Sequence, residues 1–157
     1  MKFISHRGNL SGVNIFTENY PYHIDKVINM GFDVEVDVWY KEEGFFLGHD
    51  SPQYKVSLEW IRERKNTLWC HCKNFESLQE LLKINTINCF WHENDAVALT
   101  SMNNIWAYPG KQPIKNSIAV MPELFNDKLD ECIGICSDYI QNYKTQYENS
   151  DRDRKIL

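Results

Sequence analysis

The alternation of hydrophobic and polar positions is clearest just after Gly31. Three valines alternate there with two acidic residues, in the order Val34, Glu35, Val36, Asp37 and Val38. Residues two apart in a β-strand share a face, so this pattern predicts a strand with its valines on one side and both carboxylates on the other. Two like charges side by side on a buried strand are costly unless something neutralises them.

The rest of the first half alternates between strand-like and helix-like patterns. Strands are predicted at residues 2–5, 33–40, 67–73 and 88–92. Helices are predicted to begin at Pro21, after Ser57 and after Asn74, because proline suits a first helical turn and Ser and Asn side chains cap helices. The first two strand-to-strand repeats take about thirty residues each, the size of a βαβ unit, which predicts a parallel sheet.

Beyond Glu93 the predicted strands follow one another more closely. They span residues 95–100, 104–108, 117–121 and 132–136. A tail follows that starts as a helix at Ser137 and is expected to fray over about residues 148–157. A standard eightfold barrel typically needs ~250 residues and rarely fewer than ~200. We therefore expect one domain, residues 1–157: a compact TIM-type α/β barrel with reduced or missing outer helices in the second half, or else an open sheet.

Composition narrows the class of protein. The chain is 43% hydrophobic and 13% aromatic, which is typical of a folded domain. A net charge of −5 argues against nucleic-acid binding through a basic surface. The chain lacks an apolar run of about 18 residues and a signal-like start, so we expect a soluble, cytoplasmic protein without stable membrane insertion. Five cysteines without a secretion signal favour reduced thiols over disulfides.

The same central segment carries candidate chemistry. Carboxylates such as Glu35 and Asp37 are ligands that Mg²⁺ or Ca²⁺ prefers, which makes the pair a candidate metal site. His49 follows a short apolar run at residues 45–47 and is a candidate acid or base. The segment between residues 31 and 52 thus supplies both metal ligands and a proton-transfer group.

Five short motifs follow one another in the order of a known family. They are His6-Arg7-Gly8, Glu18-Asn19, Gly31, Glu35-x-Asp37 and Gly48-His49-Asp50. This series resembles the N-terminal signature of the glycerophosphodiester phosphodiesterases, within the phosphatidylinositol phospholipase C-like phosphodiesterase superfamily. Lys73 matches the end of a family strand that reads Glu-x-Lys, and residues 134–138 resemble the final strand, which ends in Thr-Asp. The chain between these points is shorter than the family's.

The resemblance implies a metal-dependent phosphoric diester hydrolase that cleaves a glycerophosphodiester-like small molecule. His6 and His49 are implied as the catalytic acid/base pair, a task that suits imidazole because its unperturbed pKa is ~6.5. Arg7 is implied as a catalytic, phosphate-binding residue and Lys73 as a second phosphate ligand. The metal is implied to bind the two carboxylates and to stabilise charge in the transition state.

One position departs from the family pattern. The family has a third carboxylate ligand where this chain has His71. Trp69, His71 and Lys73 share one face of the predicted strand, so His71 is expected to point into the site with Cys70 and Cys72 facing away. An imidazole ligand shifts the preferred ion from Mg²⁺ or Ca²⁺ toward Mn²⁺ or Zn²⁺. Alternatively, His71 contacts only the phosphate.

Other interpretations stay open at this point. The substrate could instead be a surface-polysaccharide or lipid-linked head group, or the chain could be a non-catalytic phosphodiester-binding module on a degenerate barrel. The two histidines favour catalysis, because phosphate binding alone needs no proton carrier. His92 is expected either to line the site or to lie on the surface, and Trp106 and Tyr108 to form core or a substrate wall. Asp138 and Glu123 are weaker site candidates. A thinned barrel would expose apolar strand faces, which a homo-oligomer would cover.

Overall fold

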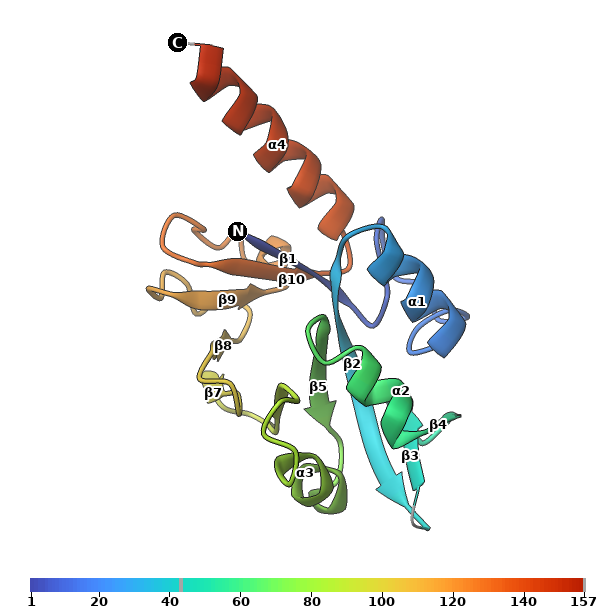
Figure 1. Cartoon of the computed structure of the whole chain (residues 1–157). Helices are drawn as coiled ribbons and strands as arrows, with labels where there is room; N and C mark the ends of the chain where they lie inside the picture. The colour runs from blue at the N-terminus through green and yellow to red at the C-terminus, as the bar shows by residue number, and fades with distance from the viewer. Residues whose placement is uncertain (43, 157) are drawn as a thin grey trace.

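The computed structural model describes residues 1–42 and 44–156, and its centre is one ten-stranded sheet that curls into a half-barrel (Figure 1). The strands are β1 Lys2–His6, β2 Asp33–Lys41, β3 Gly44–Leu47, β4 Tyr54–Val56, β5 Leu68–Cys72, β6 Cys89–Phe90, β7 Val97–Leu99, β8 Ile105–Ala107, β9 Ser117–Val120 and β10 Gly134–Ser137. The helices are α1 Pro21–Asn29, α2 Leu58–Glu63, α3 Phe75–Leu82 and α4 Ile140–Ile156, with a 3₁₀ turn, η1, at Pro122–Leu124.

The sheet is mixed, with a parallel centre and antiparallel additions. Parallel pairing runs through β6-β5-β2-β1-β10-β9-β8. The long strand β2 also pairs antiparallel with β3, which pairs antiparallel with β4, and β7 pairs antiparallel with β8. Because neighbouring parallel strands point the same way, their carboxyl ends lie along one edge of the curled sheet, and loops from all of them meet there.

The TIM-type barrel expected from the sequence is wrong. A (β/α) barrel needs a helix between each pair of parallel strands, but in the described chain between β6 and β10 the strands β7, β8 and β9 are joined by loops and the 3₁₀ turn η1, without an α-helix. The hairpin β7–β8 takes the place of a parallel strand and its helix. The first-half helices α1, α2 and α3 do occur, so the failure lies in the second half, where strands follow one another too closely for crossover helices.

The apolar side chains form two cores, one on each face of the sheet. The larger lies between the sheet and the helices and includes Val34, Val36, Val38, Ile24, Ile61, Leu81 and Ile140. The smaller lies inside the curl and contains Ile4, Trp69, Phe90, Trp106, Ile118, Val120 and Cys136. The three valines of β2 therefore face the helices, which confirms the side assigned to them by their alternation with acids.

The capping residues and the proline correctly predicted where three helices begin. Ser57 and Asn74 each accept a hydrogen bond from the backbone three residues on, at the starts of α2 and α3, and Pro21 opens α1. The short strand β4 is not foreseen by the sequence pattern, because its three residues are too few to show a period. α4 continues as helix to Ile156, through most of the segment expected to fray, and residue 157 lies outside the described residues.

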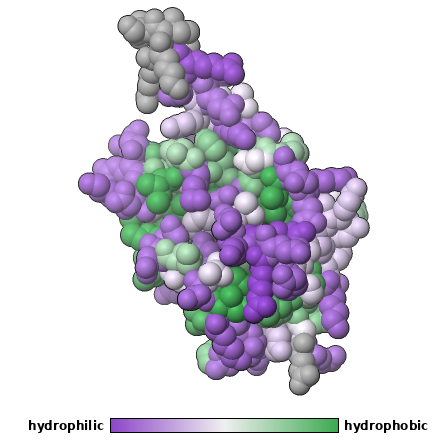
Figure 2. All heavy atoms as spheres, in the orientation of Figure 1, coloured by the Kyte–Doolittle hydropathy of each residue, from purple (hydrophilic) through white to green (hydrophobic). Residues whose placement is uncertain are grey.

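The second half of α4 projects beyond the sheet (Figure 1). Its first turn is anchored by Ile140, which is fully buried, and a ring contact joins Tyr147 to Phe3 on β1 at 5.6 Å between centroids. Figure 2 shows hydrophilic residues along the coloured part of the projection, as a solvated helix requires. Among the described helices, none is both long enough and apolar enough to traverse a bilayer.

Gly48 fixes the turn that carries His49. Its φ is +150°, and a Cβ there would lie 2.1 Å from the carbonyl oxygen of Ser51. The Gly48 backbone N–H donates to Asp37 O at 3.1 Å, and its carbonyl accepts from Trp39 Nε1 at 2.6 Å. The turn thus ties the end of β3 to β2, and there is no room for a side chain.

We predict that Gly48→Ala lowers the free energy of unfolding by about 1–3 kcal/mol, because alanine is strained at this φ and its Cβ collides with backbone. Urea denaturation measures the change. Gly44→Ala is the control, since a Cβ there is 3.3 Å from the flexible Lys55 side chain and makes only ordinary contacts with Phe46 and the Lys41 carbonyl oxygen, at 3.6 and 3.7 Å. Equal losses in the two variants would contradict this account of the turn.

Candidate functional site

The turn after β1 directs the first two candidate residues toward the edge where strands end. Arg7 and Gly8 have φ values of +54° and +94°. The Arg7 backbone N–H donates to Glu35 O, and its carbonyl accepts from the Asn19 backbone N–H, both at 3.0 Å. A positive φ at a non-glycine residue costs of order 1–3 kcal/mol and persists only where the surrounding structure enforces it. Here the two backbone bonds hold Arg7 in that conformation.

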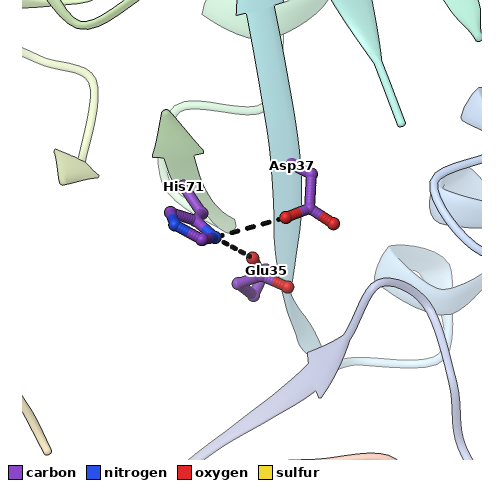
Figure 3. A group of neighbouring side chains, drawn as sticks. All are labelled: Glu35, Asp37 and His71. Carbon is purple, nitrogen blue, oxygen red and sulfur yellow. Dashed lines mark ion pairs between the residues drawn. The ribbon is translucent and has the colours of Figure 1, made fainter. Parts of the chain in front are cut away.

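Two carboxylates and one imidazole converge on a single point at this edge (Figure 3). Glu35 and Asp37 come from β2, and His71 comes from β5, where it is the register partner of Asp37. His71 Nδ1 lies 3.2 Å from Asp37 Oδ1 and 3.7 Å from Glu35 Oε1. One ligand atom from each residue falls within 4.8 Å of the others, so all three can reach one ion. His71 points into the site, as its face of the predicted strand requires.

Cationic and amide groups surround Asp37. Arg7 Nε lies 3.0 Å from Asp37 Oδ2, and Lys73 Nζ lies 3.5 Å from Asp37 Oδ1. The Asn19 side chain donates to Asp37 Oδ2 and accepts from the Asp37 backbone N–H, each at 2.9 Å. Asn19 belongs to the Glu18-Asn19 motif, but its bonds to β2 could not be read from the sequence.

The two acids differ in their tendency to ionise. Burial, and next the charge of Asp37, raise the pKa of Glu35 above its usual range. Burial also opposes ionisation of Asp37, but His71 and the positive charge of Arg7 outweigh it and hold the pKa of Asp37 well below its usual range. Glu35 therefore lacks the compensating charge that Asp37 has, and a bound cation would supply it.

His6 forms a hydrogen-bonded pair with Asp138. The His6 Nδ1 lies 2.7 Å from Asp138 Oδ1, which also accepts from Asn9 Nδ2 at 2.8 Å. Because a carboxylate only accepts, Nδ1 carries a proton, and in the neutral ring Nε2 is left as the basic nitrogen. Burial lowers the pKa of His6, but the bond to Asp138 and the charge of Glu35 outweigh it and raise the pKa.

Asp138 is a weak candidate from sequence alone, yet the structure gives it a defined place. β1 and β10 are parallel neighbours in which Ser5 pairs with Ser137, so the next residues of both strands, His6 and Asp138, face each other. The two residues are 132 positions apart in the chain. Only the pairing of the first and last strands brings them together. Glu123, the other weak candidate, instead accepts hydrogen bonds from Ser137 and Tyr143.

His49 lines the same pocket as His6. Its Nδ1 is 2.7 Å from Asp50 Oδ1, and the side chain is 40% exposed, so the ring stands at the pocket mouth. Partial burial, and next the positive charge of Arg7, lower the pKa of His49. The pKa values of the two candidate acid/base histidines are thus shifted in opposite directions.

A column of rings backs His71. His71 stacks on His92 with centroids 4.2 Å apart and on Phe90 at 5.3 Å, and Tyr108 meets His92 edge-on at 4.4 Å. His92 therefore lines the site, one of the two roles left open for it. Burial, and next His71, lower the pKa of His92 to about 3. Trp106 is 2% exposed and belongs to the inner core, although its edge reaches the pocket.

These groups share a pocket of about 400 Å³, which we call the main pocket. Its charged side is lined by His6, Arg7, Glu35, His49, His71 and Lys73. Its other side is lined by His92, Glu93, Trp106, Tyr108, Pro109, Val120 and Met121. β1, β5, β6, β8 and β9 end at or next to residues of this pocket, and β2 contributes Glu35 before it continues to Lys41, so the curl of the sheet assembles the pocket.

Unsatisfied polar atoms test whether the residues fit a metal and an anion. Within the described residues, the buried side-chain atoms that lack a hydrogen-bond partner are Arg7 Nε, Glu35 Oε2, Asp37 Oδ1, Asn88 Oδ1 and His92 Nδ1. All but the Asn88 atom belong to this site. Buried polar groups are normally hydrogen-bonded, so these atoms, although some of them form ion pairs within the site, keep capacity to bind a further group. Two carboxylate oxygens and an imidazole fit a divalent ion, with the imidazole favouring Mn²⁺ or Zn²⁺ over Mg²⁺ or Ca²⁺.

Comparison of the chain with protein-family models, with curated proteins and with solved structures gave no match. The likeness to the glycerophosphodiester phosphodiesterases thus rests on the quoted motifs alone.

We predict that Mn²⁺ stabilises the protein by binding at Glu35, Asp37 and His71. A ligand that binds only the folded state at about a hundredfold excess over its Kd stabilises by about 2.7 kcal/mol. Thermal unfolding with a series of Mg²⁺, Ca²⁺, Mn²⁺ and Zn²⁺ measures the effect. Asp37→Asn should abolish the metal-dependent rise in Tm.

The matched control is Asp33→Asn on the same strand. Asp33 is the first residue of β2, where its carboxylate accepts hydrogen bonds from Lys2 and Trp69, each at 3.1 Å. This variant should keep the full metal-dependent rise whatever its own Tm. A rise that survives Asp37→Asn would place the metal elsewhere.

Proposed function

We propose that the protein is a metal-dependent phosphodiesterase that hydrolyses a small, glycerophosphodiester-like substrate. One observation carries the proposal: two carboxylates and an imidazole that could hold one ion lie together with two cationic side chains, Arg7 and Lys73, and with His6 and His49 around one pocket. Each group corresponds to a requirement of phosphodiester cleavage, namely charge neutralisation, anion binding and proton transfer. The resemblance of the motifs to the glycerophosphodiester phosphodiesterases supports the same chemistry.

Proton transfer falls to the two histidines. Attack on phosphorus requires removal of a proton from the incoming oxygen, and departure of the alcohol requires delivery of one. Asp138 fixes the His6 ring and stabilises its protonated form, so that Nε2 can take up or hold a proton. His49 stands at the pocket mouth, where it can exchange a proton with the other side of the phosphate. The attacking oxygen is that of water or of a neighbouring hydroxyl of the substrate.

Anion binding falls to Arg7 and Lys73. Both cations lie against Asp37 and line the main pocket, so they present positive charge to a phosphate while that carboxylate keeps them in place. A guanidinium binds two phosphate oxygens in a fork. A divalent ion held by Glu35, Asp37 and His71 would neutralise phosphate charge when bound.

The setting we propose is the cytoplasm. All five cysteines are buried and free, which suits a reducing compartment. The proposed partner is a small-molecule diester rather than nucleic acid, because the main pocket measures about 400 Å³ and the net charge is −5. Val97 and Leu99 on β7 expose apolar surface that a second copy of the chain could cover. Light scattering would detect such a homo-oligomer.

We predict that His6→Ala and His49→Ala each reduce hydrolysis of glycerophosphocholine by about 10²- to 10⁴-fold, because its alcohol leaving group needs a proton and its attacking oxygen must lose one. Rates are measured with Mn²⁺ at saturation. His23→Gln is the control, since His23 contacts Gly8 O on the helix side and should retain wild-type activity. Full activity in either alanine variant would remove the mechanism.

A non-catalytic phosphodiester-binding module is the competing outcome of the same assay. It would be indicated if no metal of the series supports hydrolysis by the wild-type protein while glycerophosphocholine still raises its Tm. If the protein binds the diester without hydrolysing it, the proposed anion-binding roles of Arg7 and Lys73 would stand and the proposed acid/base roles of His6 and His49 would fall.

We predict that Asp138→Asn lowers kcat by at least about tenfold and changes KM much less, because the main role of Asp138 is to position His6. The metal-dependent rise in Tm should persist, which separates a positioning effect from loss of the fold. A change confined to KM would mean that Asp138 binds the substrate directly.

A further inference from the structure

A second cavity adjoins the main pocket and meets it at the catalytic residues. This side pocket measures about 300 Å³ and shares Arg7 and His49 with the main pocket. Among the described residues, these two are the lining residues common to both cavities. Arg7 is the phosphate ligand and His49 a proton carrier in the proposed function, so a phosphate bound between them faces a cavity on either side. A phosphodiester has two ester arms, and the cavities offer one place for each.

The half of the main pocket beyond the phosphate groups is mostly apolar, with His92 and Glu93 as its polar members. Tyr108, Pro109, Val120 and Met121 form its wall. The Tyr108 hydroxyl donates to the Glu93 carbonyl at 2.9 Å, so the polar end of that side chain is already satisfied and the ring remains for contact. A hydroxyl-rich group placed here would give up hydrogen bonds to water without replacing most of them. An aromatic or aliphatic group would lose nothing and would bury apolar surface.

The side pocket is the more polar of the two cavities, although Val13 and Ile15 also line it. Glu18, Asp50, Gln53 and Asp138 contribute oxygen acceptors to its lining. Glu18 and Asp138 are held in place by Asn9, whose Nδ2 lies 2.8 Å from an oxygen of each. Carboxylate oxygens accept hydrogen bonds from hydroxyl groups, and the Gln53 amide can both donate and accept. These acids repel a second anion, so the lining suits a neutral polyol.

We propose that the substrate is an asymmetric phosphodiester, with a hydroxyl-rich alcohol in the side pocket and an apolar, aromatic or aliphatic alcohol against the Tyr108 wall of the main pocket. The inference rests on the proposed phosphodiesterase function for the location of the phosphate. It extends that function by assigning a chemical class to each arm. Glycerol or a sugar fits the polar arm, whereas a second polyol is a poor fit for the other.

The test ranks three diesters of primary alcohols by affinity: glyceryl benzyl phosphate, diglyceryl phosphate and dibenzyl phosphate. Dissociation constants are measured by calorimetry with Mn²⁺ on the His6→Ala protein, in which turnover does not consume the ligand. Glyceryl benzyl phosphate should bind at least about tenfold more tightly than either symmetric diester, a difference typical of one well-matched group in a pocket.

Variants assign the arms to the cavities. Tyr108→Ala, in the same His6→Ala background, should abolish the advantage over diglyceryl phosphate. Gln53→Ala should reduce the advantage over dibenzyl phosphate. Tyr22→Ala is the control, because that ring is 61% exposed and lies outside both cavities. It should leave both preferences intact.

The outcomes separate this inference from the proposed function. Equal affinities, tightest binding of a symmetric diester, or a benzyl preference that survives Tyr108→Ala would overturn the assignment of the arms. The expected ranking in a wild-type protein that hydrolyses none of the diesters would support the arms and refute the phosphodiesterase. Hydrolysis of all three diesters with equal affinities would support the phosphodiesterase and refute the assignment of the arms.

Discussion

The structure depends on a single electrostatic constraint, the burial of Glu35 and Asp37 on one face of β2. Their exposed fractions are 2% and 0%, so neither charge is solvated by water. Two like charges in such a place raise each other's energy unless cations approach closely. Arg7, Lys73 and His71 supply part of that compensation, but oxygens of both acids remain without hydrogen bonds. We propose that a bound positive ion completes the compensation of these two charges.

The curled sheet satisfies this constraint by topology. Parallel strands bring their carboxyl ends to one edge, so short loops from distant parts of the sequence meet around β2. Arg7, Asn19 and Met121 adopt left-handed backbone conformations in these loops, and each lies at the site. Such conformations are uncommon outside glycine and are tolerated where neighbouring structure enforces them. Helices are dispensable here, because the pocket needs strand ends rather than an outer ring.

The local pattern predicted much of the site, since Val34 to Val38 alternate strictly and a strand's two faces follow from period two. The direction of His71 came from the same rule applied to β5. The curl and the Asp138–His6 pair could not be predicted, because both depend on pairing between the two ends of the chain. The barrel prediction failed in the second half of the chain. The sequence there indicates how far apart the short strands are, but not the direction in which neighbouring strands pair. In the structure β8 pairs parallel with β9 and antiparallel with β7.

The central claim is that Glu35, Asp37 and His71 form one metal centre. Pulsed electron paramagnetic resonance of the Mn²⁺-loaded protein tests it most directly, because the spectrum reports nitrogen nuclei bonded to the ion. The account predicts one bound Mn²⁺ per chain with an imidazole nitrogen coupling that disappears in His71→Gln while the ion stays bound to the two carboxylates. A spectrum without nitrogen coupling, or a coupling unchanged by His71→Gln, would contradict it.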